Sequence, residues 1–96
     1  MTMKFGLIGL GYHGMNAVSP VFYLEDCPVD LVAVCDVRQE TLDAYTRPIA
    51  AKYTDYRAML ADADLDAVYV AAGMDLHYGI VQDCLEAGKH VVVEKP

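Results

Sequence analysis

The sequence predicts an α/β protein, a doubly wound parallel sheet with helices on both faces, formed by one domain over residues 1–96. Short apolar runs typical of buried strands alternate with helical segments, and no linker or repeat interrupts them. The hydrophobic share of 55% suits a buried sheet covered by helices. Right-handed crossovers should join the parallel strands, and the doubly wound order 3-2-1-4-5 is the expected strand order.

The chain opens with a strand and a glycine-rich turn. The strand is the apolar stretch FGLI, residues 5–8, and the glycines follow in the pattern G-x-G-x-x-G at Gly9, Gly11 and Gly14. Glycine lets another group approach the main chain closely, and a turn between a buried strand and a helix suits a phosphate. Taken alone, the pattern is equally compatible with an ordinary glycine-rich turn.

The next elements are a helix, a strand and a second helix. A helix is expected over 12–26, and Pro20 should kink or divide it. VDLVAVCD, residues 29–36, has a continuously apolar centre, as expected for a strand covered on both faces. A second helix is expected over 38–51, with an interruption at Pro48.

The second half of the chain continues the alternation. A short third strand is expected at residues 52–55, KYTD. A two-turn helix should follow at 56–62, YRAMLAD, and a fourth strand at 66–72, DAVYVAA. The helix that follows has the clearest 3.6-residue period. Its predicted apolar face consists of His77, Ile80, Val81, Cys84 and Leu85.

Both ends of this helix carry capping signals. Asp75 is expected to cap its start, and Gly88 with Lys89 is expected to end it. HVVVEKP, residues 90–96, predicts the fifth strand.

Composition argues against several classes of function. The net charge of −7, without a basic cluster, disfavours nucleic-acid binding. No apolar run approaches the roughly 20 residues that span a bilayer, and the N-terminus lacks signal-peptide features, so we expect a soluble cytoplasmic protein. Cys27, Cys35 and Cys84 lack C-x-x-C spacing and are expected to be reduced and structural, with no metal site.

An acidic residue strengthens the glycine signal. Asp36 ends the first strand–helix–strand unit, twenty-two positions after Gly14. In dinucleotide sites the glycines lie under the pyrophosphate and a carboxylate accepts hydrogen bonds from the adenosine ribose. Asp36 could instead be a solvated strand end or a cap for the following helix. As a ribose ligand it would repel a 2′-phosphate and favour NAD over NADP, although Arg38 could accept such a phosphate.

Three stretches, GLIGLGYHG, LVAVCD and DAVYVAAGMDLHYGIVQDCLEAGKHVVVEKP, together closely resemble the N-terminal half of the Gfo/Idh/MocA oxidoreductases. The resemblance implies a Rossmann domain that binds NAD and serves hydride transfer with a sugar, polyol or similar secondary alcohol. Family members are usually several times longer and carry a second domain that binds the small-molecule substrate. We therefore expect a truncated chain that is inactive alone and prone to self-association.

The resemblance also implies roles for particular residues. Glu94, Lys95 and Pro96 match the E-K-P motif, in which Glu94 would lie near the nicotinamide ribose and Lys95 would be catalytic, assisting proton transfer from the substrate hydroxyl. His77 matches a histidine near the cofactor, although it could equally pack in the apolar face of its helix. The other implied cofactor contacts are Gly9, Gly11, Tyr12, His13, Gly14, Asp36, Val37, Arg38, Ala72 and Gly73.

One loop departs from the family pattern. Members usually have Thr or Ser, then Pro and Asn, after the fourth strand, where this chain has Ala72, Gly73 and Met74. Whether side chains of this loop contact the cofactor stays open. A second function class also stays open, a non-catalytic dinucleotide-binding or interaction module. The E-K-P motif favours the oxidoreductase, since a sensor has no need of Lys95.

Overall fold

The computed structural model describes residues 2–12 and 14–93 of the chain. Within them, parallel strands form one sheet in the order β3-β2-β1-β4-β5, which confirms the predicted topology. The central strand β1 pairs with β2 on one side and with β4 on the other, so the winding of the chain reverses beside β1. The strands are β1 (Met3–Ile8), β2 (Val29–Cys35), β3 (Ala51–Tyr53), β4 (Ala67–Val70) and β5 (His90–Val93).

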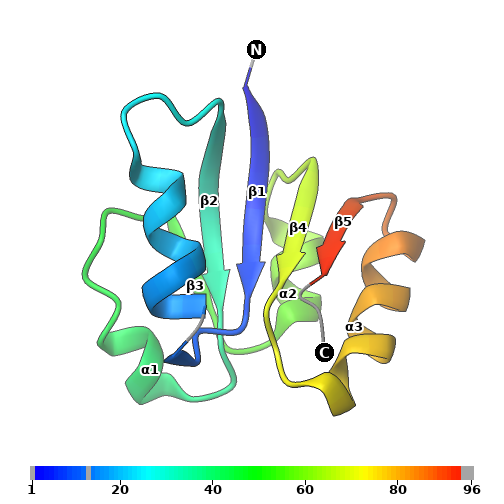
Figure 1. Ribbon diagram of the computed structural model, residues 1–96. Helices are drawn as coiled ribbons and strands as arrows, with labels where there is room; N and C mark the ends of the chain where they lie inside the picture. The colour runs from blue at the N-terminus through cyan, green and yellow to red at the C-terminus, as the bar shows by residue number, and fades with distance from the viewer. Residues whose placement is uncertain (1, 13, 94–96) are drawn as a thin grey trace.

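Helical segments cover both faces of the sheet (Figure 1). On one face lie a π-helical turn, a 3₁₀ segment and a short α-helix, and on the other lie two α-helices. Those of the first face are η1 (Gly14–Val18), η2 (Ser19–Tyr23) and α1 (Gln39–Asp43), and those of the second are α2 (Tyr56–Asp62) and α3 (Met74–Glu86). None of the helices in the described part of the chain has the length and apolarity that crossing a bilayer requires.

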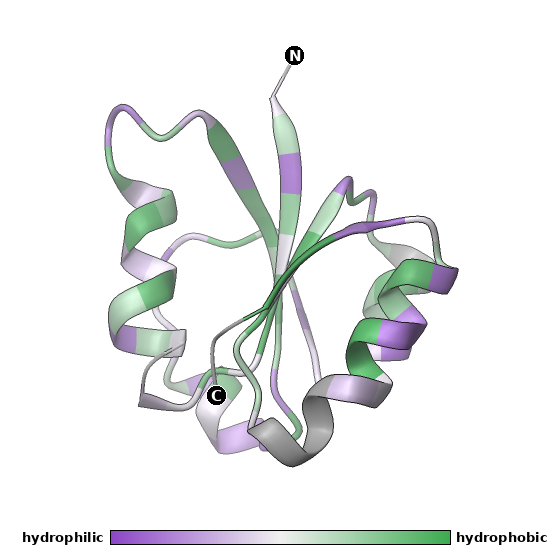
Figure 2. Cartoon of the chain, turned by 45° about the vertical axis from the view of Figure 1, so that its right-hand side comes forward, coloured by the Kyte–Doolittle hydropathy of each residue, from purple (hydrophilic) through white to green (hydrophobic). Residues whose placement is uncertain are grey.

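Each face of the sheet has its own apolar cluster. Successive strand residues point to opposite faces, so Ile8 packs with α2 and α3 while Leu7 packs with η1 and α1. Cys35 and Val34 divide between the two clusters in the same way. This two-sided burial explains why the strands are mainly apolar toward their carboxyl ends, where green predominates in Figure 2, although charged residues interrupt β1, β2 and β3.

The predicted helix over 12–26 is divided, as Pro20 suggested. The π-helical turn η1 ends at Val18, and Pro20 lies in the first turn of η2. Proline has no N–H to donate and clashes with the carbonyl four residues earlier, so a regular α-helix cannot continue through it. Ser19, at the junction, is fully buried, and its hydroxyl lies 2.6 Å from the hydroxyl of Tyr45.

The second helix is much shorter than predicted: α1 ends at Asp43 and does not reach residue 51. Tyr45 leaves the helical path to enter the core, where it is 2% exposed. Lys52 then donates from Nζ to the carbonyl oxygens of Leu42 and Tyr45, at 2.8 and 2.9 Å, and so satisfies acceptors at the end of α1. The expected helix over 38–51 is wrong beyond Asp43.

The start of α3 also differs from the prediction. The helix begins at Met74, and its N-cap residue is Gly73, without a side-chain hydrogen bond. Asp75 is therefore inside the helix, and its expected role as the cap is wrong.

The end of α3 follows the prediction. Gly88 has φ +78°, and its N–H donates to the carbonyl of Leu85 at 3.0 Å. Lys89 N–H donates to the carbonyl of Cys84 at 3.1 Å, which completes a Schellman motif. Leu85, expected on the apolar face, is 57% exposed. It lies about 100° around the helix from the buried Cys84, at the margin of the apolar face.

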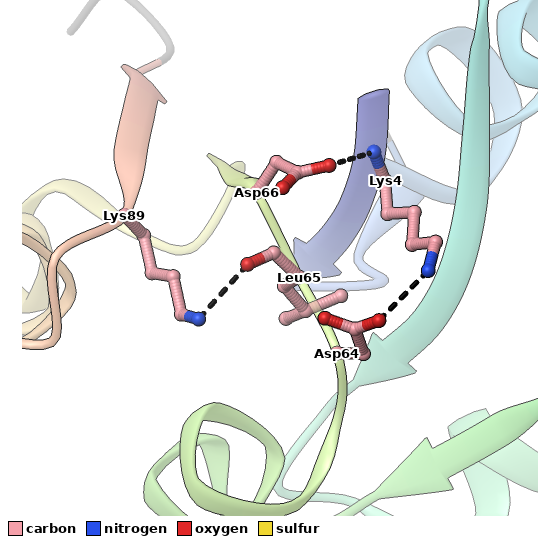
Figure 3. Close-up of polar contacts among 5 residues, drawn as sticks. All are labelled: Lys4, Asp64, Leu65, Asp66 and Lys89. Carbon is pink, nitrogen blue, oxygen red and sulfur yellow. Dashed lines mark hydrogen bonds and ion pairs between the residues drawn. The ribbon is translucent and has the colours of Figure 1, made fainter. Parts of the chain in front are cut away.

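At the amino ends of the strands, Asp66 joins β1, β4 and β5. Lys4 N–H donates to Asp66 Oδ2 at 2.8 Å, and Asp66 N–H donates to the carbonyl of Lys4 at 2.8 Å. His90 N–H donates to the carbonyl of Asp66 at 3.1 Å. Lys89 Nζ reaches the carbonyl of Leu65 at 2.9 Å (Figure 3). These contacts hold the strand ends that lie opposite the candidate site.

Candidate functional site

A cavity of about 580 Å³ opens at the carboxyl ends of the strands. It is lined by residues at or just after the carboxyl ends of β1, β2, β3 and β4, together with Gly79 and Ile80 of α3. In open parallel sheets, ligands bind at this edge, where the winding of the chain reverses. Its lining includes Ile8, Gly9, Cys35, Asp36, Val37 and Ala72. Among the predicted cofactor contacts, Gly9, Asp36, Val37 and Ala72 thus meet at one cavity.

Gly9 is required by the turn itself. Its φ is +101°, a conformation that side chains disfavour, and its N–H donates to the carbonyl of Cys35 at 2.8 Å. A Cβ on Gly9 would lie 2.7 Å from the backbone nitrogen of Ala72. The glycine therefore lets the loop after β4 approach the end of β1.

The other two glycines of the motif differ from each other. A Cβ on Gly14 would collide with the carbonyl oxygen of Gly9, so Gly14 permits close packing of η1 on the turn. Among the residues that the structure describes, a Cβ on Gly11 would meet no atom within 4 Å, and the φ of Gly11 is not positive. Packing within the chain explains Gly9 and Gly14 but leaves the space beside Gly11 unfilled. In dinucleotide-binding turns, a glycine without such neighbours is where the diphosphate approaches the main chain.

Asp36 is a buried, hydrogen-bonded carboxylate at the end of β2. It is 7% exposed, and its Oδ2 accepts from Leu10 N–H at 2.8 Å. Its Oδ1 accepts from Arg38 N–H at 2.9 Å and from Arg38 Nε at 3.3 Å. A carboxylate offers about four acceptor positions, so one remains for a ligand hydroxyl.

These contacts keep Asp36 ionised. Burial alone would raise the pKa of this carboxyl, but the N–H groups of Arg38 and Leu10 and the Arg38 guanidinium outweigh burial and hold the pKa below its usual value. Asp36 is not the solvated strand end considered above. It does not cap α1 either, because the N-cap of that helix is Arg38, without a side-chain bond. The carboxylate joins two loops at the site.

Val37 and Arg38 follow Asp36 in the loop after β2, and Val37 lines the cavity whereas Arg38 does not. The apolar side chain of Val37 is 79% exposed at the cavity. The side chain of Arg38 is 56% exposed, and its Nε is directed to Asp36. The guanidinium thus partly offsets the carboxylate charge that would repel a 2′-phosphate.

The remaining predicted residues fall into two groups. Tyr12 lies in the glycine loop with its side chain 87% exposed, and Gly73 precedes α3 as its N-cap. His77 lies in the first part of α3, but its side chain is not among those described. The other predictions lie outside the described residues: His13, Glu94, Lys95 and Pro96.

The structure adds a segment that the sequence reasoning missed. Thr54, Asp55, Tyr56 and Arg57, after β3, line the same cavity. Asp55 caps α2 by accepting from Arg57 N–H at 2.9 Å, and the Arg57 guanidinium lies 4.8 Å from the centre of the Tyr56 ring. Their position after a parallel strand could have indicated them, because all strand carboxyl ends share one edge of the sheet.

The cavity contains no charged cysteine. The thiol of Cys35, which is 2% exposed, has its pKa raised to about 12, chiefly by burial. It is therefore a neutral, apolar part of the wall at physiological pH. Among the side chains that the structure describes, no three of His, Cys, Asp or Glu gather in a way that could hold a metal ion.

Comparison with known proteins agrees with this geometry. Residues 3–96 match the Gfo/Idh/MocA family, the oxidoreductase family with an NAD-binding Rossmann fold. The chain is 35% identical over 101 residues to inositol 2-dehydrogenase of Salmonella paratyphi B, covering 100% of this chain and 29% of that protein. It is 33% identical over 106 residues to a glycosyl hydrolase family 109 protein of Shewanella baltica, covering 99% of this chain and 23% of that protein.

A solved structure shows the same arrangement of elements. Scyllo-inositol dehydrogenase from Lactobacillus casei, with bound NAD(H) and scyllo-inositol, aligns with a TM-score of 0.90 at 30% identity. The alignment covers 100% of this chain and 28% of that one, so the chain spans less than a third of the length of these relatives. From the match over residues 3–96, the chain belongs to the Gfo/Idh/MocA oxidoreductase family as its NAD-binding Rossmann domain, with NAD as cofactor.

Proposed function

We propose that this chain is the nucleotide-binding part of an oxidoreductase that transfers hydride between NAD and a secondary alcohol of a polyol or sugar. The observation that carries the proposal is the open approach to Gly11, in the same turn as Gly9, which lines a cavity together with Asp36. The names of the Salmonella and Lactobacillus relatives support the polyol class of substrate.

Each part of the site has a distinct task in this proposal. The loop at Gly11 receives the diphosphate, because no side chain prevents its approach to the backbone. Asp36 offers its remaining acceptor position to an adenosine ribose hydroxyl. Val37 and Ala72 contribute apolar groups to the lining of the cavity. When bound, NAD would supply the hydride acceptor that the side chains of this domain lack.

The proposed roles of Glu94, Lys95 and His77 rest on the family motif. Lys95 would assist transfer of the substrate hydroxyl proton, and Glu94 would lie near the nicotinamide ribose. A lysine whose pKa is lowered by a nearby positive nicotinamide is suited to acid–base work. His77 remains a proposed neighbour of the cofactor and not the catalytic base.

The proposal for the whole protein extends beyond these residues. The chain spans 28% of the inositol dehydrogenase whose structure contains substrate, so substrate selection is proposed to depend on residues outside these 96. The chain alone should then bind NAD but reduce no NAD with polyols, which an NADH-absorbance assay would show. A cytoplasmic location and self-association remain predictions.

Calorimetric titration with NAD tests the proposed function. Wild-type chain should bind NAD, and Gly11→Val should abolish binding while the circular dichroism stays that of a folded protein, because a branched side chain would fill the diphosphate approach. Ala17→Val is the matched control, since it places the same side chain at an exposed position of η1. Wild-type protein that is folded but does not bind NAD would refute the proposal, and unchanged binding by Gly11→Val would refute the role of the loop.

A further inference from the structure

The helix α3 contains a glycine that nothing in its own packing requires. Gly79 is the sixth of the thirteen residues of α3, well inside the helix. Glycine there destabilises a helix relative to alanine, because it loses more backbone freedom on folding. Its φ is not positive, and a Cβ on it would meet no atom within 4 Å among the side chains that the structure describes, so neither conformation nor crowding there accounts for it.

The position of Gly79 suggests what the missing side chain leaves room for. Gly79 lines the same cavity as Gly9, Asp36 and Val37, whereas the next residue, Ile80, is 6% exposed and belongs to the core. The glycine therefore lies where the helix surface meets the cavity. Val37, on the loop after β2, contributes an exposed apolar side chain to the same cavity.

We propose that Gly79 determines the width of the adenosine end of the dinucleotide site, leaving space for the adenine base that a side chain on α3 would occupy. The inference rests on the proposed function, because it assigns the half of the cavity near Asp36 to adenosine. It adds a residue of α3 to a site otherwise built from the strand-end loops. It also accounts for a helix-destabilising residue at a position where alanine would fit the chain itself.

The test compares side chains of increasing size at Gly79 in the full 96-residue chain, with NAD and ADP-ribose as probes. Gly79→Ala should raise the melting temperature by several degrees and yet weaken the binding of both ligands, so stability and affinity change in opposite directions. Gly79→Leu should weaken both ligands by about tenfold or more, because its side chain would overlap the base. Equal losses are expected since both ligands carry the adenosine half.

Gln82→Leu is the matched control, an exposed position one turn further along α3 that does not line the cavity, and it should leave both affinities unchanged. Wild-type affinity in a folded Gly79→Leu chain would overturn the inference and leave the proposed function intact. A loss for NAD but not for ADP-ribose would also overturn it, because Gly79 would then lie beside the nicotinamide half. Wild-type chain that binds neither ligand would overturn both proposals.

Discussion

Asp36 at the end of β2 accepts a hydrogen bond from Leu10 N–H, at 2.8 Å, across 26 positions of sequence. The bond ties the glycine turn after β1 to the loop after β2, and its acceptor is the carboxylate proposed to bind ribose. Because the two loops share this contact, a change at Asp36 should affect both the shape of the glycine turn and its ligand.

Replacing Asp36 by Ala should lower the affinity for NAD and reduce the preference for NAD over NADP. Wild-type chain should bind NAD more tightly than NADP, and Asp36→Ala should weaken NAD binding and bring the two affinities together, since the repulsion of a 2′-phosphate is removed. Loss of the acceptor for Leu10 and Arg38 N–H should also lower the free energy of unfolding by about 1–3 kcal/mol. Calorimetry and urea unfolding measure the two effects.

Asp30→Ala is the control for Asp36→Ala, because Asp30 is an exposed carboxylate in the same strand, away from the site. Tighter binding of NADP than of NAD by the wild type would show that Arg38 and not Asp36 decides cofactor choice.

The pH dependence of stability should report the ionised state of Asp36. Its pKa is lowered in the folded chain, so the unfolded chain binds the proton more readily. The stabilisation from the carboxylate is therefore complete above the unfolded pKa of about 3.9 and is lost as pH falls through the folded value. The melting temperature of the wild type should fall more steeply between pH 6 and pH 2 than that of Asp36→Asn. Parallel curves would contradict this account.

Gly14 and Gly11 should respond differently to alanine. Gly14→Ala would force a Cβ against the carbonyl oxygen of Gly9, which is backbone and cannot easily move, so the free energy of unfolding should fall by about 1–3 kcal/mol or more. Gly11→Ala places its Cβ in open space and should leave stability within about 0.5 kcal/mol of the wild type. Urea denaturation of both variants tests the contrast. Equal stabilities would show that the chain accommodates a Cβ at Gly14 without cost.

The three cysteines should differ in reactivity. Burial raises the pKa of Cys35 to about 12 and that of Cys84 to about 11, and both thiols are almost inaccessible. Cys27 is half-buried and should be the thiol that a disulfide reagent modifies in the folded chain at pH 8. All three should react after denaturation in urea. Rapid modification of Cys35 in the folded state would indicate that the cavity wall opens.

The β5 edge should promote self-association. Within the described sheet β5 is an outer strand, and Val92 and Val93 are 43% and 41% exposed. An apolar strand edge with unpaired backbone groups can pair with another chain, and lysine at such an edge opposes this pairing. Sedimentation equilibrium should show oligomers for the wild type and monomers for Val92→Lys, whereas Val21→Lys on η2 should associate like the wild type. A monomeric wild type would contradict the prediction.

The local patterns of the sequence determined the sheet and its motif. Apolar runs indicated the strands, and their alternation with helices indicated a doubly wound sheet, for which the order 3-2-1-4-5 was expected and is observed. Pro20 predicted the division between η1 and η2, and Gly88 predicted the end of α3. The spacing of Gly9, Gly11 and Gly14 to Asp36 was enough to indicate a dinucleotide site. Apart from the strand order, which was expected from the fold class, these features depend on backbone preferences or on the pattern within short stretches of the chain.

Tertiary structure decided what those residues contact. The sequence predicted a helix beyond Asp43, but α1 ends there, and Tyr45 is buried with its hydroxyl against that of Ser19, a contact between segments 26 residues apart. The three glycines look alike in sequence, and only the approach of Ala72 and η1 separates the two that packing requires from Gly11, which faces open space. Asp36 meets Leu10 because parallel pairing of β1 and β2 brings their carboxyl ends together. Such contacts depend on how distant segments approach one another, which no local period encodes.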